Sequence, residues 1–351
     1  MEEGININYT NTKKRFEQID IATGIVILLV VIGHLVPFNG YVFRLIFSFH
    51  MPYFFLKSGY FSKRKVFEGD IIKFVEHRIK KLLIPSLVMN CLVLILGIAT
   101  VSSFWEAIYF IFVSPNHEWF VMALFFVQLI AFIYFRVIYY MNDKRMEQVC
   151  TIFIVMLIPF LASFSLEKGI HDAKYIPFKV GSVLLGLLFF FIGYAMREWF
   201  DLNQIKNSWR ITKQARFVYV IAICVICALT YNNTYVNVAN CYWGRSDMYF
   251  ILTSVFWSAT VVVIAFKLLK KQCCKKLCSF LEICGRNSLI IYFGQSLLFS
   301  VFNKCLFVWT GIQYTPMIDL PWYLCIAYFI LTVAILVPIC VVKEKRKGKI
   351  K

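Results

Sequence analysis

His34 lies at the end of a long apolar run and is the first side chain in the chain that suggests chemistry. The run reads DIATGIVILLVVIGHLVPFNG, with Asp20 at its beginning. Histidine is the usual general base near neutral pH, and an ionisable side chain within an apolar run is a functional candidate. Fourteen residues of helix span about 21 Å, so Asp20 and His34 cannot meet within one helix. A second interpretation stays open, in which His34 is a helix-end histidine that only packs and binds one partner.

The next apolar run contains polar residues that a membrane helix rarely tolerates. Its sequence FSFHMPYFFLKSGYF includes His50, Pro52 and Lys57. If the chain turns at the preceding Asn-Gly pair, Arg44 returns to the depth of His34, and His50 lies about five residues deeper. Pro52 has no amide hydrogen to donate, so the helix should open there, which requires protein or a water-filled cavity beside it. We predict a polar cavity within the membrane, with Arg44 and His50 as substrate-binding residues.

The elements that position these residues are predicted to be membrane-spanning helices. The chain has 351 residues, of which 60% are hydrophobic and only 16% charged, and its mean hydropathy is +0.71. Apolar runs of about the length that crosses a hydrocarbon layer recur along it. They cover residues 20–38, 41–61, 82–101, 119–140, 149–165, 180–196, 215–232, 248–266, 287–309 and 322–342. We predict an all-α, polytopic membrane protein with about ten transmembrane helices in a single domain over residues 1–351.

The basic residues predict the orientation of these helices. The formal net charge is +18, and 30 of the 37 Lys and Arg residues fall at the termini, in alternate connections or, for Arg136 and Arg216, in the adjoining ends of two runs. By the positive-inside rule, that side faces the cytoplasm. Both the segment over 1–19 and the basic tail over 343–351 are then cytoplasmic, in a multi-pass protein of the cell (inner) membrane. The charge is explained by topology, so we expect membrane lipid around the protein and no nucleic acid partner.

The placement of the cysteines and the lack of several known motifs argue against a metal ion, a bound nucleotide and a serine nucleophile. Most of the twelve cysteines lie in apolar runs or on the predicted cytoplasmic side, where thiols stay reduced. The CCKKLC segment over 273–278 matches no zinc-binding spacing, so we expect no metal. The sequence has no P-loop, no GxGxxG after a strand and no GxSxG.

The predicted outer connections are short, aromatic and polar. They cover 102–119, 165–179 and 232–248. Aromatic faces with polar neighbours suit sugar rings, and they equally suit the aromatic belt at a membrane interface. His117 and Glu118, just before the run over 119–140, are predicted to bind a substrate on the outer side.

Several segments, taken in order, resemble the membrane acyltransferase-3 family. They are IDIATGIVILLVVIGH, FSFHMPYFFLKSGYF, HRIKKLLIPSL, EWFVMALFF, FFIGYAMRE and GRNSLIIYFGQS, and together they span nearly the whole chain. The resemblance implies a ten-helix membrane enzyme with cytoplasmic termini. Such an enzyme moves an acyl group, commonly acetyl from cytoplasmic acetyl-CoA, to hydroxyls of sugars, often in surface polysaccharides.

The resemblance also assigns roles to individual residues. His34 matches the catalytic histidine of the family, as general base or as acyl relay. Arg78 and Lys81 match its Arg-x-x-Arg, which is associated with CoA binding. Three residues apart, they share a helix face and could clamp a phosphate, although Lys81 lacks the bidentate fork of arginine. The alternative is that both merely anchor the end of a helix.

Two positions depart from the family pattern. Gln295 stands where the family often has a histidine, and Thr23 stands where it usually has Arg or Lys. Reflecting the chain about its turn places Lys57 one position from Thr23 in depth. We therefore predict that Lys57 replaces the missing charge in the donor site, with Asp20 nearby, unless it only extends to the cytoplasmic surface.

The leading hypothesis from the sequence is an O-acyltransferase that uses acyl-CoA and a glycan acceptor. The alternative from another class is a transporter or flippase for a lipid-linked glycan, although no duplicated halves are visible. A non-catalytic membrane partner is a third alternative, because of the two departures from the family pattern.

Overall fold

Helices make up nearly all of the structured chain. The computed structural model describes residues 16–346 apart from 39, 63–68, 97–102, 114–118, 142–144, 155–156, 158–179, 200–212, 241, 313 and 315, together with residue 348. Within these ranges, the only β pairing is an isolated bridge between Asn237 and Tyr242. The predicted all-α class is confirmed.

Five helices of the described chain are long and apolar enough to cross a membrane. They are α8 (Trp119–Met141), α10 (Val180–Trp199), α13 (Asp247–Lys270), α15 (Ser288–Thr310) and α16 (Trp322–Arg346). Each begins and ends within a few residues of a predicted run. The helices α1 (Glu17–Gly33) and α12 (Lys213–Asn232) occupy two further runs. These helices indicate an integral, multi-pass membrane protein.

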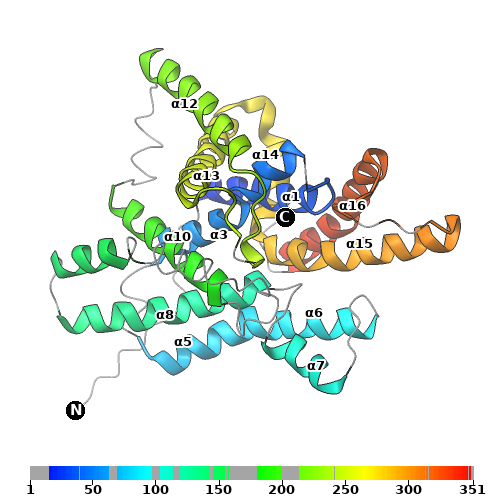
Figure 1. The fold of residues 1–351 in the computed structure, drawn as a ribbon, viewed down its shortest axis with the longest axis horizontal. Helices are drawn as coiled ribbons and strands as arrows, with labels where there is room; N and C mark the ends of the chain where they lie inside the picture. The colour runs from blue at the N-terminus through cyan, green and yellow to red at the C-terminus, as the bar shows by residue number, and fades with distance from the viewer. Residues whose placement is uncertain are drawn as a thin grey trace.

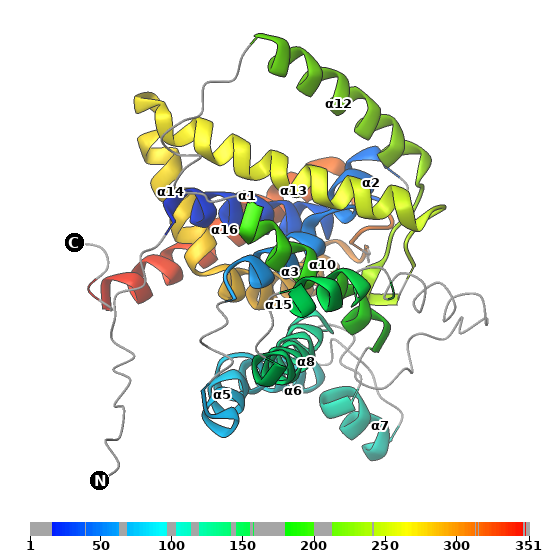
Figure 2. The same ribbon diagram turned by 90° about the vertical axis from the view of Figure 1, so that its left-hand side faces the viewer.

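The helices form layers that both views show in the same order. In Figure 1, α12 and α13 lie on one side of the molecule, and α8 lies on the opposite side with α5 (Ile71–Arg78) and α6 (Ile84–Ile95), which follow α3 (His50–Tyr60) in the chain. Figure 2 shows α1 and α3 between these two groups, and the packing of α13 on α1 and of α10 on both α3 and α8 agrees with that order. Residues of α1 and α3 are therefore central.

The predicted run over 41–61 is divided into α2 (Tyr41–Phe47) and α3 (His50–Tyr60). Pro52 lies in the first turn of α3 and has no amide hydrogen, so the carbonyl of Ser48, four residues earlier, lacks its helical donor. The hydroxyl of Ser254 in α13 donates to that carbonyl at 2.5 Å. The predicted opening of the helix is confirmed, and a neighbouring helix satisfies the backbone that it leaves unpaired.

α3 and α10 cross at a separation that only glycine permits. A Cβ atom at Gly59 of α3 would lie 1.8 Å from the carbonyl oxygen of Phe190, and one at Gly193 of α10 would lie 2.1 Å from that of Leu56. Both distances are far shorter than any van der Waals contact, so a larger residue would push the backbones apart. The crossing fixes the position of Lys57, which lies between Leu56 and Gly59 on α3.

The helical segment that corresponds to the predicted run over 82–101 begins earlier, at Ile71, and forms a continuous rod. It consists of α5 (Ile71–Arg78), the π-helical turn η1 (Ile79–Leu83) and α6 (Ile84–Ile95). Asp70 begins it, because its carboxylate accepts a hydrogen bond from the amide of Ile72 at 2.8 Å. Figure 1 shows the rod alongside α8.

Two segments predicted as connections contain helices, which corrects the sequence analysis. The helix α14 (Lys275–Arg286) packs along α1, and a Cβ at Gly24 of α1 would lie 2.0 Å from the carbonyl oxygen of Leu281. Within the predicted outer connection over 102–119, α7 (Phe104–Ile108) continues into the π-helical turn η2 (Tyr109–Val113). The first helix is amphipathic and the second is short, so neither resembles a membrane span in sequence.

Candidate active site

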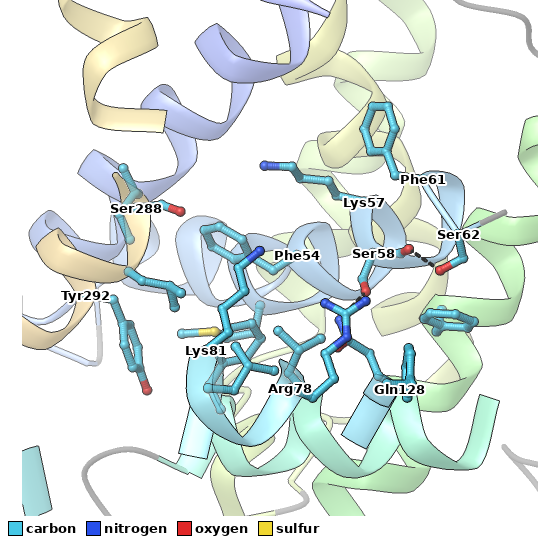
Figure 3. Close-up of a pocket in the computed structure, with 18 residues that line it drawn as sticks. Phe54, Lys57, Ser58, Phe61, Ser62, Arg78, Lys81, Gln128, Ser288 and Tyr292 are labelled. Atoms are coloured by element: carbon cyan, nitrogen blue, oxygen red, sulfur yellow. Dashed lines mark hydrogen bonds between the residues drawn. The ribbon is translucent and has the colours of Figure 1, made fainter. Parts of the chain in front are cut away.

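A pocket of about 320 Å³ opens among the central helices. Its wall comes from α1, α3, α5, η1, α8, α10 and α15, and Figure 3 shows the side chains that line it. A volume of this size is at the lower end of the range for small-molecule sites, about 300–1,000 Å³. The pocket can therefore hold part of an extended ligand.

Three basic residues that the sequence analysis placed in a donor site line this one pocket. They are Lys57 of α3, Arg78 of α5 and Lys81 of η1. Figure 3 shows them grouped around the pocket, with Ser288 and Tyr292 on one side and Gln128 on the other. The guanidinium carbon of Arg78 lies 5.0 Å from the centroid of the Phe74 ring. Burial lowers the pKa of Arg78, yet arginine remains protonated in proteins.

The amino group of Lys57 is held by Thr23, the residue that the sequence predicted to lie at nearly the same depth. Lys57 Nζ donates to Thr23 Oγ1 at 2.7 Å, and Thr23 is 0% exposed. The Thr23 hydroxyl in turn donates to the carbonyl of Ile19 at 2.6 Å and lies 3.1 Å from the hydroxyl of Tyr53. The predicted proximity of Lys57 and Thr23 is confirmed, and it places an ammonium group in the pocket wall beside α1.

The pocket also contains a polar pair that the sequence analysis missed. Gln128 Nε2 of α8 donates to Ser58 Oγ at 3.0 Å. Among the described residues, Gln128 Oε1 and Arg78 Nε have no hydrogen-bond partner although both atoms are buried. Buried polar atoms without partners are rare in folded proteins, so these two atoms mark a polar region in the wall of the pocket. A glutamine inside an otherwise apolar run was the sequence signal for this pair.

The remaining wall of the pocket is largely apolar and aromatic. Phe120 of α8 is its centre, with ring centroids 5.6 Å from Phe54 and 5.8 Å from Tyr292. Ile27 of α1 and Met51 of α3 complete this part. The pocket thus combines cations with an apolar surface, as a ligand with both phosphates and an apolar arm requires.

His34 lies beyond this pocket, at the C-terminal end of α1. Its amide donates to the carbonyl of Val30, and its partly buried ring meets the edge of Phe47 at 5.9 Å between centroids. His34 does not line the pocket, but Ile27 does, and His34 follows it by seven positions, which correspond to about 10 Å of helix.

His50, at the beginning of α3, contacts the same Phe47 ring across the interruption between α2 and α3. Its ring centroid is 4.6 Å from that of Phe47, and the side chain is 2% exposed. His50 Nδ1 lies 2.8 Å from the carbonyl oxygen of Ile46. A carbonyl only accepts, so Nδ1 carries the hydrogen and Nε2 of the neutral ring is the acceptor.

The other predicted site residues lie outside the pocket. Arg44 donates to the carbonyl of Tyr231 at 3.2 Å and lies over its ring at 5.6 Å, so it faces α12. Asp20 lies about one turn before Thr23 on α1 and does not line the pocket.

Three further positions complete the comparison with the sequence analysis. Gln295 of α15 is buried, and within the described chain its Oε1 has no hydrogen-bond partner. His117 and Glu118 lie outside the described residues. Among the residues that the structure does describe, no group of three or more His, Cys, Asp or Glu is arranged to hold a metal ion.

Comparison with known proteins shows the family to which the chain belongs. The acyltransferase-3 family, described as an acyltransferase domain, matches residues 16–341. The chain belongs to the acyltransferase-3 family. A local similarity exists to the Nodulation protein NolL of Mesorhizobium japonicum, with 36% identity over 86 residues, which is 22% of this chain and 23% of that protein. No solved structure matches the chain.

The matched family is described as an acyltransferase domain, and chemistry of that kind uses an acyl donor and an acceptor. The pocket at Lys57, Arg78 and Lys81 has the charge to bind an anionic donor. His34 lies at the end of α1, outside this pocket.

Proposed function

We propose that this acyltransferase moves an acyl group, most simply acetyl, from cytoplasmic acyl-CoA to a hydroxyl of a cell-surface or lipid-linked glycan. The observation that supports this best is the pocket that combines three cationic side chains with an apolar, aromatic wall. Lysine and arginine suit the phosphates of CoA, and the apolar wall suits its pantetheine arm.

His34 acts as the general base of the transfer. Its imidazole takes the proton of the acceptor hydroxyl as the oxygen attacks the thioester carbonyl. The carbon–sulfur bond then breaks, the acceptor carries the new ester, and the leaving sulfur of CoA takes the proton from the His34 imidazolium and departs as a thiol. The thioester has to advance about 10 Å beyond Ile27 to reach His34, so the pantetheine arm extends along α1 during the reaction.

The orientation of the chain gives this transfer its direction. About ten spans with both termini in the cytoplasm place the donor pocket near the basic side of the cell membrane, where acyl-CoA is made. His34 is then nearer the outer side, where surface glycans are assembled. Five helices of the described chain that are long and apolar enough to cross a membrane, and the concentration of Lys and Arg in alternate connections, support this orientation.

A deletion strain tests the proposal and separates it from a glycan flippase. Mass spectrometry of the surface glycan should show the loss of one acyl mass from the repeating unit, with the polymer itself retained. Re-expression of the wild-type chain should restore the acyl group. Loss of the whole polymer would indicate a flippase, and an unchanged glycan would contradict the proposed acceptor.

A further inference from the structure

A series of aromatic rings connects His34 to the outer connection between α12 and α13. The ring of Phe47, which meets His34, is stacked on Phe43 at 3.7 Å between centroids. Phe43 is stacked on Tyr235 at 5.7 Å with an angle of 2° between the ring planes. Tyr235 lies 5.7 Å from Tyr242, whose side chain is 45% exposed. The series thus begins at the proposed base and ends at the surface.

The connection that carries these tyrosines is a folded hairpin and has two distinct sides. Asn237 and Tyr242 exchange backbone hydrogen bonds of 2.7 and 2.9 Å. Alternation along each arm directs successive side chains to opposite sides. The buried side consists of Val236, Val238 and Trp243, and the other side of Tyr235, Asn237 and Tyr242. In Figure 2 this connection lies beside α2 at the end of α12.

Neighbouring helices hold the hairpin in place. Ser182 of α10 donates through its hydroxyl to the carbonyl of Val238 at 2.9 Å. The buried amide of Asn233 donates to the carbonyl of Trp243 and accepts from the amide of Ser246, both at 2.9 Å. The hairpin is therefore attached to α10, one of the helices that line the donor pocket.

The backbone next to Tyr235 is strained. Thr234 has a φ of 64°, in the left-handed region that a β-branched residue seldom adopts. Such strain persists only where surrounding contacts enforce it, and it concentrates at functional sites. Here the strained residue comes immediately before the ring that stacks on Phe43.

The outward side of the hairpin has the composition of a sugar-binding surface. The face of an aromatic ring carries a partial negative charge, which attracts the polarised C–H groups on the flat face of a pyranose ring. Asn237 Nδ2 donates to the hydroxyl of Tyr235 at 2.7 Å, so an amide and a phenol lie together beside the rings. Polar groups of this kind fix the orientation of a ligand by bonding to its hydroxyls.

We propose that Tyr235, Asn237 and Tyr242 form the acceptor platform, which binds a pyranose ring of the glycan and presents its hydroxyl toward His34. This inference rests on the proposed glycan acyltransfer and names the acceptor-binding residues of that reaction. The competing explanation is a general aromatic belt at the membrane interface. In an aromatic belt, substitution of any exposed aromatic residue should have a similar effect on the KM for the glycan. In the platform, only the rings connected to His34 should affect it.

Steady-state kinetics of variants distinguish the two explanations. Surface glycan that has been de-esterified with alkali serves as acceptor and acetyl-CoA as donor, with the purified full chain in lipid nanodiscs. We expect Tyr242→Ala to raise the KM for the glycan by about threefold to tenfold, because an aromatic contact contributes about 0.5–1.5 kcal/mol. The KM for acetyl-CoA should stay unchanged, and Tyr242→Phe should behave as the wild type.

Trp309→Ala is the matched control, because Trp309 is a 92% exposed aromatic residue at the far end of α15. A KM for the glycan within twofold of the wild-type value in Tyr242→Ala would overturn the platform, and so would an equal increase in both variants.

Saturation-transfer NMR tests binding apart from turnover. Sugar protons of the same glycan should receive magnetisation from the His34→Ala protein and lose it when Tyr242→Ala is added. Absence of transfer to the single variant would overturn the platform even if acyl transfer is confirmed. Transfer to the single variant, together with no acylation by the wild type, would refute the proposed function and keep the platform.

Discussion

Lys57→Leu removes the ammonium group that lies in the pocket wall and leaves the fold in place. Thr23 still donates to the carbonyl of Ile19, and the crossing of Gly59 with α10 is untouched. The change therefore isolates one positive charge that lies 2.7 Å from Thr23 and lines the same pocket as Arg78.

The expected loss can be worked out from this geometry. A hydrogen bond between an ammonium group and a phosphate contributes about 1.5–3 kcal/mol net. This corresponds to a decrease of about tenfold to 150-fold in affinity for acyl-CoA. In the double variant Thr23→Arg with Lys57→Leu, the guanidinium replaces the charge from α1, in space that the shorter leucine vacates. We expect the double variant to recover about tenfold of the loss.

Isothermal titration of acetyl-CoA into each detergent-purified variant measures this effect. Lys80→Leu is the control, because the side chain of Lys80 is 66% exposed, pairs with Glu76 and does not line the pocket. Thermal unfolding should show that both variants remain folded. If Lys57→Leu binds acetyl-CoA as tightly as the wild type, or if the double variant is no better than Lys57→Leu alone, then Lys57 does not supply the missing charge.

Arg78→Ala and Lys81→Ala should each raise the KM for acyl-CoA, and the difference from wild type should shrink at high salt as phosphate attraction is screened; unchanged kinetics in both would make them helix anchors. His50→Ala should retain about tenfold more acyl transfer than His34→Ala, because its Nδ1 is committed to the carbonyl of Ile46; equal losses in single-turnover assays would refute this. Gly59→Ala should lower the unfolding midpoint far more than Gly40→Ala, whose Cβ would meet its nearest atom at 3.3 Å, and equal midpoints would argue against the α3–α10 crossing.

The long helices and part of the donor site could be predicted because their signals are local. Runs of apolar residues fix the spans, and reflection of the chain about its turn was enough to bring Lys57 next to Thr23. For Arg44 the same estimate gave a depth but no direction for the side chain, whose guanidinium donates to the carbonyl of Tyr231 in α12. Depth within a membrane follows from counting residues, whereas the direction of a side chain depends on a helix distant in sequence.

Other features depend on contacts that no local pattern reveals. The helix α14 has its apolar residues on one face only, so its mean composition resembles that of a basic connection. The Gln128–Ser58 pair joins residues 70 positions apart, and the Ser254 bond that satisfies Ser48 spans 206 positions. Aromatic residues over 232–248 fitted both a sugar site and an interfacial belt. Only the fold shows that Trp243 packs inward while Tyr242 remains exposed.

Transfer of radiolabelled acetyl from acetyl-CoA to the de-esterified glycan, by purified protein in proteoliposomes, tests the central role of His34 most directly. The wild type should label the glycan, and a folded His34→Ala variant should be at least about 100-fold slower, which is the usual cost of losing a general base. Retention of more than about a tenth of the wild-type rate by that variant would contradict the proposed role of His34.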